Sequence, residues 1–295
     1  MRTRAGISSK ETTAMKKPLV LLVLLALTAL ACQGSASSLK LYVFDCGRLK
    51  SGNPAPLIEH GVTTTDMSVA AYLIAHPRGT LLWETGVIPD EMIQPGGATS
   101  FRATVQKTLQ SQLAEIGYKP SDVTYLALSH YHYDHSANAN AFAGAMWLVQ
   151  KPERELMFSG TLGPSSPNSP TAETTAARFA ALQNSKTTLL DGDHDVFGDG
   201  SVVIISTPGH TPGHQSLLVN LPKTGAILLS GDLYHYPAER EQKEFTPFAA
   251  LGDPAKEVVS KAKVEALLKE KRATLWMQHD LIANEHMKKS PAYYQ

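Results

Sequence analysis

The sequence predicts an α/β fold in which two β-sheets pack face to face between outer helices, a four-layer αββα sandwich. Short runs rich in β-branched, aromatic and aliphatic residues alternate with runs of helical period, and the alternation occurs in both halves of the chain. No linker divides the body of the chain. Of its 295 residues 43% are hydrophobic and 18% charged, a balance that allows a sizeable core.

The first half of the chain is expected to contain four strands and one helix. The strands are short apolar runs bounded by Gly, Pro or Asp, at residues 39–44, 68–75, 80–84 and 123–129. The helix is expected over residues 100–118, where Ser100 can cap its start. Its apolar residues recur at helical spacing and are Val105, Leu109, Leu113 and Ile116.

The second half repeats this organisation. Strands are expected at residues 146–150, 202–206, 215–220, 226–230 and 273–278, and helices at 152–158, 171–183 and 254–271. Asp253 is favourable as the cap of the last helix, and Pro254 is favourable at its first position. The Ser/Pro-rich segment 159–170 is the longest expected loop, and such loops are often lids or specificity loops.

The N-terminal segment is typical of a secretory signal peptide. Lys16 and Lys17 precede an apolar run at residues 19–30 that is too short to span a bilayer. Plain cleavage after Ala31, lipid attachment to Cys32 and a retained anchor stay open as alternatives. We expect an exported protein, either periplasmic or a membrane-anchored lipoprotein. The expected divisions are an upstream extension at 1–14, a signal peptide at 15–31, a linker at 32–38 and one domain at 39–295.

Cysteine usage and charge limit the structure and the partners. Only Cys32 and Cys46 occur, so an oxidising compartment allows at most one disulfide. The chain has 27 basic and 27 acidic residues, but five basic residues and one acid lie in residues 1–31, which leaves 22 against 26. Because binding to nucleic acid usually requires a basic face, we expect a small-molecule partner and no nucleic acid. The oligomeric state stays open, a dimer included.

The strongest chemical signal follows the strand expected at residues 123–129. Residues 129–135 have the sequence Ser-His-Tyr-His-Tyr-Asp-His, with three imidazoles and a carboxylate within six positions. Imidazole nitrogens and carboxylate oxygens suit Zn²⁺. Three further His or Asp residues each come just after another predicted strand, so all seven should meet at one edge of the sheets. The seven candidate ligands are His130, His132, Asp134, His135, His210, Asp232 and His279.

This ordered set resembles the metallo-β-lactamase fold superfamily, whose motif is His-x-His-x-Asp-His, then a His in a Gly-His-Thr-Pro-Gly turn, then an Asp and a His. The resemblance covers residues 39–285 and implies a binuclear centre. The implied ligands are His130, His132 and His210 for the first metal, Asp134, His135 and His279 for the second, and Asp232 for both. Zinc is the default, with two ions per chain, although Mn²⁺, Fe²⁺ or Co²⁺ suit the same ligands.

The resemblance also implies metal-dependent hydrolysis. A hydroxide held by two metal ions is a nucleophile at neutral pH, because the metals lower the pKa of bound water toward about 7. Asp134 and Asp232 are therefore predicted to be catalytic as well as ligating. Glu84 stands in Glu-Thr-Gly where the family has Asp-Thr-Gly, so it is expected either to orient a ligand histidine or to be an ordinary strand-end residue. His214 is expected to support the site without binding metal.

The same residues favour a lactone as substrate. The subclasses that open β-lactams generally have Cys or Ser at the position of Asp232. Segments 128–138 and 208–217 look most like the quorum-quenching N-acyl homoserine lactonase branch, whose members open a lactone by hydroxide attack at the ester carbonyl. The resemblance therefore implies hydrolysis of a lactone or related ester, with N-acyl homoserine lactones as the leading substrates.

In that branch a tyrosine three residues after the bridging Asp assists the carbonyl. This chain has His235 at that position, between two tyrosines. Tyr234 and Tyr236 are therefore the candidate catalytic tyrosines, and packing at the wall of the cleft is the alternative role for both.

Other functions stay open. Periplasmic β-lactam hydrolysis by the same metal centre is the main alternative. Hydrolysis of phosphodiesters or thioesters is less favoured, because neither needs an exported enzyme and no basic surface is evident. A metal-dependent binding protein without turnover is a further alternative that a missing ligand would indicate, and no ligand is missing from the motif.

Overall fold

The computed structural model describes residues 39–100, 102–162, 178–248 and 252–295. The predictions for residues 1–38, which include the signal peptide, the linker and Cys32, lie outside the described residues. So do residues 163–170 of the expected loop and 171–177 of an expected helix. Among the described helices, none has the length and apolar character needed to cross a membrane.

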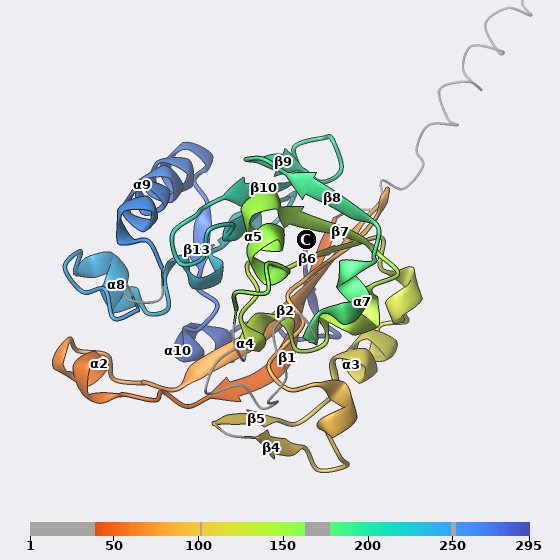
Figure 1. Ribbon diagram of the computed structural model, residues 1–295, viewed down its shortest axis with the longest axis horizontal. Helices are drawn as coiled ribbons and strands as arrows, with labels where there is room; N and C mark the ends of the chain where they lie inside the picture. Colours follow the sequence, from red (N-terminus) through yellow and green to blue (C-terminus); the bar gives the residue numbers. More distant parts are fainter. Residues whose placement is uncertain (1–38, 101, 163–177, 249–251) are drawn as a thin grey trace, which may run out of the picture. The chain divides into compact units, whose positions relative to one another are not determined.

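Within the described residues, the larger sheet has nine strands (Figure 1). Its order is β4-β5-β1-β2-β3-β6-β7-β8, and β14 also pairs with β1. The strands β1, β2 and β3 are antiparallel neighbours, whereas β3, β6, β7 and β8 run parallel. Their bounds are β1 Lys40–Leu49, β2 Met67–His76, β3 Gly79–Trp83, β4 Ala98–Ser100, β5 Ala103–Val105, β6 Tyr125–Ala127, β7 Met146–Gln150, β8 Thr187–Leu190 and β14 Tyr293–Tyr294.

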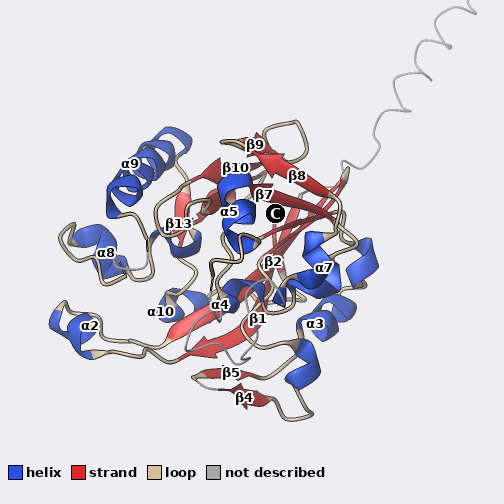
Figure 2. Ribbon diagram, viewed as in Figure 1, coloured by secondary structure: helices blue, strands red, loops and turns tan. Residues whose placement is uncertain are grey.

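The smaller sheet has five strands in the described residues, in the order β13-β12-β11-β10-β9. The pair β12 and β13 is parallel, and the other pairs are antiparallel. Figure 2 shows the strands of both sheets enclosed by the helices. The bounds are β9 His194–Asp195, β10 Val202–Ser206, β11 Gln215–Leu221, β12 Gly225–Leu229 and β13 Thr274–Trp276.

Side chains alternate across each strand and so divide the core into layers. Leu41 and Val43 of β1 point into the space between the sheets, whereas Tyr42 and Phe44 point to the opposite face. In the space between the sheets, buried residues of β1, β2 and β3 pack against those of β10, β11 and β12. The two sheets therefore share one apolar layer.

Helices cover both outer faces (Figure 1). Leu113 of α3 and Leu182 of α7 pack on the larger sheet, and Val264 and Leu268 of α9 pack on the smaller one. The layers follow the order helix, sheet, sheet, helix, which confirms the predicted αββα sandwich. The helix bounds are α2 Ala55–Glu59, α3 Leu109–Glu115, α4 Tyr133–Ser136, α5 Lys151–Met157, α7 Ala180–Gln183, α8 Pro237–Glu241, α9 Pro254–Lys271 and α10 Leu281–Glu285.

Helix α9 is confirmed residue for residue. The Asp253 carboxylate accepts hydrogen bonds from the backbone N–H groups of Ala255 and Lys256, as expected of an N-cap. Arg272 ends the helix in the left-handed region, with φ +50°. Strands 146–150 and 202–206 are confirmed with the same bounds as β7 and β10. Residues that favour caps or turns mark an end of each of these elements, namely Asp253 and Pro254 for the helix, Pro152 after β7 and Gly200 before β10.

The prediction of one helix over residues 100–118 is wrong. The strands β4 and β5 occupy its first part, and β5 adds to the edge of β1 through the pair Arg48 and Thr104. Helix α3 begins only at Leu109, where the Thr108 hydroxyl accepts from Ser111 N–H. Val105 is buried, as its spacing indicated, but it reaches the core from a strand. The available sheet edge outweighs the helical periodicity of the segment.

Candidate metal centre

The seven predicted ligands lie together at one edge of the two sheets. Strand β6 leads into residues 130–135 and β10 into the turn that holds His210, while β12 leads into η4 (Gly231–Leu233) and β13 into His279. The strands β10, β12 and β13 run in the same direction, so their carboxyl ends share an edge. Six of the seven side chains are buried, and His132 is half-buried. The predicted gathering at strand ends is confirmed.

The first group of candidate ligands brings three imidazole nitrogens close together. His130 Nε2 lies 2.8 Å from His132 Nδ1, and His210 Nε2 lies 3.0 Å from the same atom. A pair of imidazoles can share one proton in a hydrogen bond, but three nitrogens that face one another cannot all be satisfied in this way. The arrangement suits a cation at their centre.

The second group joins the first through one carboxylate. Asp232 Oδ2 lies 3.4 Å from His210 Nε2, in the first group. Asp232 Oδ1 lies 3.0 Å from His135 Nε2 and 3.1 Å from His279 Nε2. Asp134 Oδ2 is 3.6 Å from His279 Nε2 and completes the second group. The two oxygens of Asp232 therefore face two different sets of ligand atoms.

The donor set fits the metal ions that the sequence motif implies. His135 Nε2 and Asp232 Oδ1 are buried and lie 3.0 Å apart, but among the described residues neither makes a hydrogen bond of good geometry. Buried polar atoms without partners are costly, and a bound ion would satisfy both. Burial lowers the pKa of His132 to about 4 and holds the pKa of His130 and His210 well below its usual range. Neutral imidazole is the form that binds metal.

Glu84 supports the second group as predicted. Its backbone has φ +65°, which is unusual for a residue with a side chain, and its carboxylate accepts from Ser129 N–H at 3.1 Å. Glu84 Oε1 also lies 3.3 Å from His135 Nδ1. His279 Nδ1 lies 2.9 Å from the Ser68 carbonyl oxygen. Both contacts direct the Nε2 atom of the imidazole toward Asp232.

His214 supports Asp232, as the sequence indicated. His214 Nδ1 lies 3.1 Å from the Thr207 carbonyl oxygen, and its Nε2 accepts from Asp232 N–H at 3.0 Å. Both ring nitrogens are thus already engaged in the protein. Burial lowers the pKa of His214 to about 4, which keeps Nε2 available as an acceptor. His214 positions the carboxylate that joins the two groups.

The turn that carries His210 needs its two glycines because helices pack directly on it. A Cβ on Gly209 would lie 2.5 Å from the Cα of Glu257 in α9. A Cβ on Gly213 would lie 2.4 Å from the Cβ of Glu153 in α5. Real Cβ contacts are not this short, so the turn is fixed between α9 and α5. His210 is thereby held at a set distance from residues 130–135.

The structure does not bring the predicted tyrosine hydroxyls to the ligand atoms. The Tyr234 hydroxyl donates to Glu265 at 3.2 Å, and the Lys261 ammonium lies over the Tyr234 ring. The Tyr236 hydroxyl donates to the Thr65 carbonyl oxygen at 2.7 Å. These contacts match the alternative in which both tyrosines pack beside the site.

His235 occupies the place that the tyrosines were expected to fill. His235 Nε2 lies 3.2 Å from Asp232 Oδ2, and its Nδ1 lies 3.5 Å from Glu239 Oε1. Its ring lies 3.9 Å from the Phe248 ring, centroid to centroid. The turn of η4 explains this, because it sends the side chains at 234 and 236 away from Asp232 and the one at 235 toward it.

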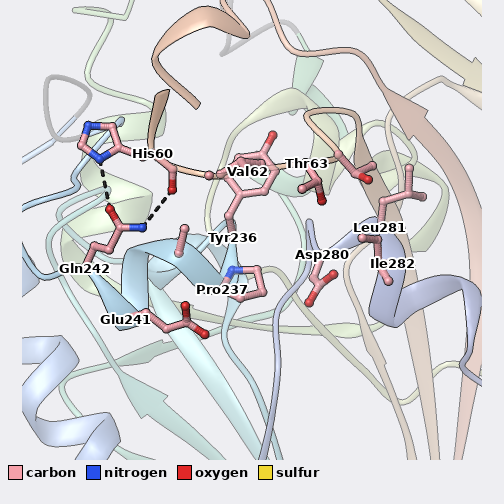
Figure 3. Close-up of a pocket in the computed structure, with 13 residues that line it drawn as sticks. His60, Val62, Thr63, Tyr236, Pro237, Glu241, Gln242, Asp280, Leu281 and Ile282 are labelled. Carbon is pink, nitrogen blue, oxygen red and sulfur yellow. Dashed lines mark hydrogen bonds between the residues drawn. The ribbon is translucent and has the colours of Figure 1, made fainter. Parts of the chain in front are cut away.

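A cavity of about 260 Å³ lies between α8, the loop after α2 and the start of α10. Figure 3 shows Tyr236 and Pro237 in its middle, Gln242 and His60 at one end, and Asp280 at the other. Gln242 Nε2 donates to the His60 carbonyl oxygen at 2.8 Å, which joins α8 to the loop after α2. Tyr236 and Asp280 directly follow His235 and His279 in the sequence.

A comparison with known protein families decides the affiliation. The sequence pattern of the metallo-β-lactamase superfamily matches residues 64–279, which include all seven candidate ligands. The chain belongs to this superfamily. It is a metal-dependent hydrolase of the metallo-β-lactamase superfamily, and the predicted resemblance is confirmed.

Curated relatives in the superfamily are lactonases by name. The chain is 28% identical over 267 residues to the N-acyl homoserine lactonase AttM of Azorhizobium caulinodans, a match that covers 88% of this chain and 99% of the relative. It is also 28% identical over 236 residues to an N-acyl homoserine lactonase of a Bacillus species, covering 77% of this chain and 87% of the relative.

Solved structures support the fold. A quorum-quenching N-acyl homoserine lactone hydrolase matches 86% of this chain and 97% of its own, with 24% identity and a TM-score of 0.66. AidC, described as a dizinc quorum-quenching lactonase, matches 87% of this chain and 93% of its own, with 18% identity and a TM-score of 0.60. The chain thus shares its fold with these two solved structures.

Proposed function

We propose that this chain is a binuclear, zinc-dependent lactonase that opens the ring of N-acyl homoserine lactones. The observation that carries the proposal is the placement of Asp232, whose two oxygens face two separate groups of ligand atoms. Full-length similarity to relatives named N-acyl homoserine lactonases supports the substrate class. We expect β-lactamases of this superfamily to have Cys or Ser in place of Asp232.

The ligand assignment follows the two groups. The residues that would hold the ions are His130, His132 and His210 for one, Asp134, His135 and His279 for the other, and Asp232 for both. Two zinc ions at these positions would activate water for attack and polarise the ester carbonyl. The protein's own contribution is to aim the ligands, through the contacts of Glu84 and the Ser68 carbonyl oxygen with two imidazoles and of His214 with Asp232. Burial keeps the imidazoles of the first group neutral.

Asp134 is the residue that would contact the substrate. The side chain of Asp134 is 11% exposed and that of Asp232 5%, so Asp134 is the more accessible carboxylate. Asp134 can hold at a carboxylate oxygen the proton that water loses and return it to the alcohol oxygen released when the ring opens. His235 Nε2 lies 3.2 Å from Asp232 Oδ2 and its Nδ1 3.5 Å from Glu239 Oε1, so His235 would hold the Asp232 carboxylate in place. The net reaction adds one water across the C–O bond of the ester.

The test is turnover of the purified protein on an N-acyl homoserine lactone and on a penicillin side by side, with metal content determined on the same sample. Fast opening of the lactone with about two zinc ions per chain is the expected result. Fast hydrolysis of the penicillin with little lactone opening would contradict the proposal. Bound metal without turnover of either compound would identify a binding protein.

We also propose that the enzyme is exported. The support is the basic and apolar sequence of residues 16–30, followed by Ala31 and Cys32. Mass spectrometry of the protein from a native host should find a mature N-terminus at Cys32, either free or bearing a lipid. An intact Met1 or Met15 terminus in a soluble intracellular fraction would contradict this proposal.

A further inference from the structure

A buried carboxylate outside the ligand set links the two segments that carry the first group. Glu153 lies in the first turn of α5 and is 3% exposed. Its Oε1 accepts from Tyr131 N–H at 2.9 Å. Its Oε2 accepts from the Thr211 hydroxyl at 2.8 Å and from Gly213 N–H at 2.9 Å. Three donors thus converge on one side chain that has no place in the ligand motif.

These donors belong to the two loops that meet at the first group. Tyr131 lies between His130 and His132, and Thr211 directly follows His210. The loops are about 80 positions apart in the chain, yet His132 Nδ1 and His210 Nε2 are only 3.0 Å apart. Glu153 bonds one loop with each carboxylate oxygen, so it fixes the separation of the loops across that gap.

The packing of α5 leaves this connection little freedom. The backbone of Gly213 approaches Glu153 so closely that a Cβ would lie 2.5 Å from the Glu153 nitrogen. Burial raises the pKa of Glu153 to about 7, although its three hydrogen bonds lower it. A buried carboxylate is destabilising unless hydrogen-bond donors satisfy its oxygens, so Glu153 requires its three donors. The carboxylate in turn fixes the positions of those donors.

The second group has different supports. His135 lies against Glu84, and His279 against the Ser68 carbonyl oxygen. Among the described residues, the hydrogen-bond partners of Glu153 are Tyr131, Thr211 and Gly213, which all flank ligands of the first group and not residues 134, 135 or 279. A change of Glu153 should therefore alter metal binding by the first group only.

We propose that Glu153 is a positioning residue that sets the geometry of the first metal site by clamping the His130–His132 loop to the His210 turn. The proposal rests on the proposed function, because it takes these histidines as metal ligands. It assigns Glu153 no contact with substrate. Changing its carboxylate should weaken metal binding by the first group and leave the second group as it was.

The experiment measures zinc affinity in full-length proteins that retain one group each. His279→Ala removes a ligand of the second group, and His210→Ala removes one of the first. Glu153→Gln is added to each, because Gln keeps the shape but cannot accept from all three donors. The matched control is Glu155→Gln, an exposed glutamate on the same helix. Zinc dissociation constants are then measured by competition with a chromophoric chelator.

In the His279→Ala protein, Glu153→Gln should weaken zinc binding by about ten- to a hundredfold, the usual effect of losing a partner that orients the ligands. In the His210→Ala protein it should have no effect, and Glu155→Gln should have none in either. Equal weakening in both proteins, or none in the first, would overturn the proposal. If neither protein binds zinc with Glu153 intact, the ligand assignment itself is wrong and the proposal falls with it.

Thr211→Val provides the same test with a smaller change. It removes one of the three donors to Glu153 while keeping the shape of a buried side chain. It should weaken zinc binding selectively in the His279→Ala protein, by less than Glu153→Gln does. This variant decides the question if Glu153→Gln fails to fold, and an unchanged dissociation constant would then contradict the proposal.

Discussion

The two candidate metal groups are built in different ways. In the second group, His135 and His279 each have a partner of their own, Glu84 Oε1 at 3.3 Å and the Ser68 carbonyl oxygen at 2.9 Å. In the first group, the carboxylate of Glu153 bonds the backbone of the surrounding loops instead. Ring orientation also occurs in the first group, where the Ser129 hydroxyl lies 2.9 Å from His130 Nδ1, so the clamp of its loops by Glu153 is what distinguishes that group. Asp232 is the residue on which both depend.

The largest effect that tests this comparison should come from Asp232→Ala. Because both oxygens face ligand atoms, its loss should lower the metal content from two ions toward one and reduce lactone turnover by more than about a hundredfold, beyond the usual effect of losing an orienting partner. Metal analysis and turnover should be measured on one sample, with exposed Asp191→Asn as control. Two tightly bound ions and a normal rate would exclude Asp232 as the shared ligand.

Glu84→Gln should affect the second group. Gln can still accept from Ser129 N–H, but it removes the negative charge beside His135 Nδ1. We expect zinc binding by the second group to weaken by about ten- to a hundredfold, with little change in the first. Zinc titration of the His210→Ala and His279→Ala proteins measures both effects. A loss of the same size in both groups would show that the two groups do not have separate supports.

Gly213→Ala should lower stability through the first group's loop. The new methyl group would lie 2.4 Å from the Glu153 Cβ, so α5 or the turn must shift, at a cost of about 1–3 kcal/mol. Chemical denaturation of the metal-free protein measures this loss. Gly144→Ala is the matched control, because no atom lies within 4 Å of a Cβ there. Equal stability of the two variants would contradict the close packing of α5 on the turn.

The smallest effect should come from Tyr234→Phe. Its hydroxyl bonds Glu265 on the outer side of the smaller sheet, so we expect a loss of about 1 kcal/mol of stability and unchanged lactone kinetics.

His235→Phe should instead reduce turnover, because it removes the only side chain of the 234–236 run whose polar atom lies near Asp232. Steady-state kinetics of both variants would decide between them, and a slower Tyr234→Phe enzyme would restore the tyrosine hypothesis.

Elements with strong local signals were predictable. The last helix has its cap, Asp253, and a proline at its first position, and the structure begins it at Pro254. Residues 100–118 have helical spacing and Ser100 as a possible cap, but no proline follows that cap, and there the edge of β1 pairs with β5 instead. Local sequence decides an element when its ends are marked, whereas a sheet edge elsewhere in the fold decides it when they are not.

Prediction from sequence had the same limit for the residues that support the candidate ligands. Glu84 and His214 could be identified because they stand inside motifs, and the structure places both against the ligand groups. Glu153 was missed, because an acid in the first turn of a helix usually serves only the helix dipole. The one local sign was its position three residues after a buried strand, and many surface helices share that feature.

The class of fold and the candidate ligand set could be predicted from the chain alone, because strand periodicity, residue type and the order of a motif are properties of the sequence. Only the tertiary structure decided which side chains face the ligands, since the turn at η4 aims His235 inward and sends Tyr234 and Tyr236 outward. It alone also paired Glu153 with two distant loops. Such contacts arise where strands from two sheets end at one edge, and no spacing along the chain encodes their distances.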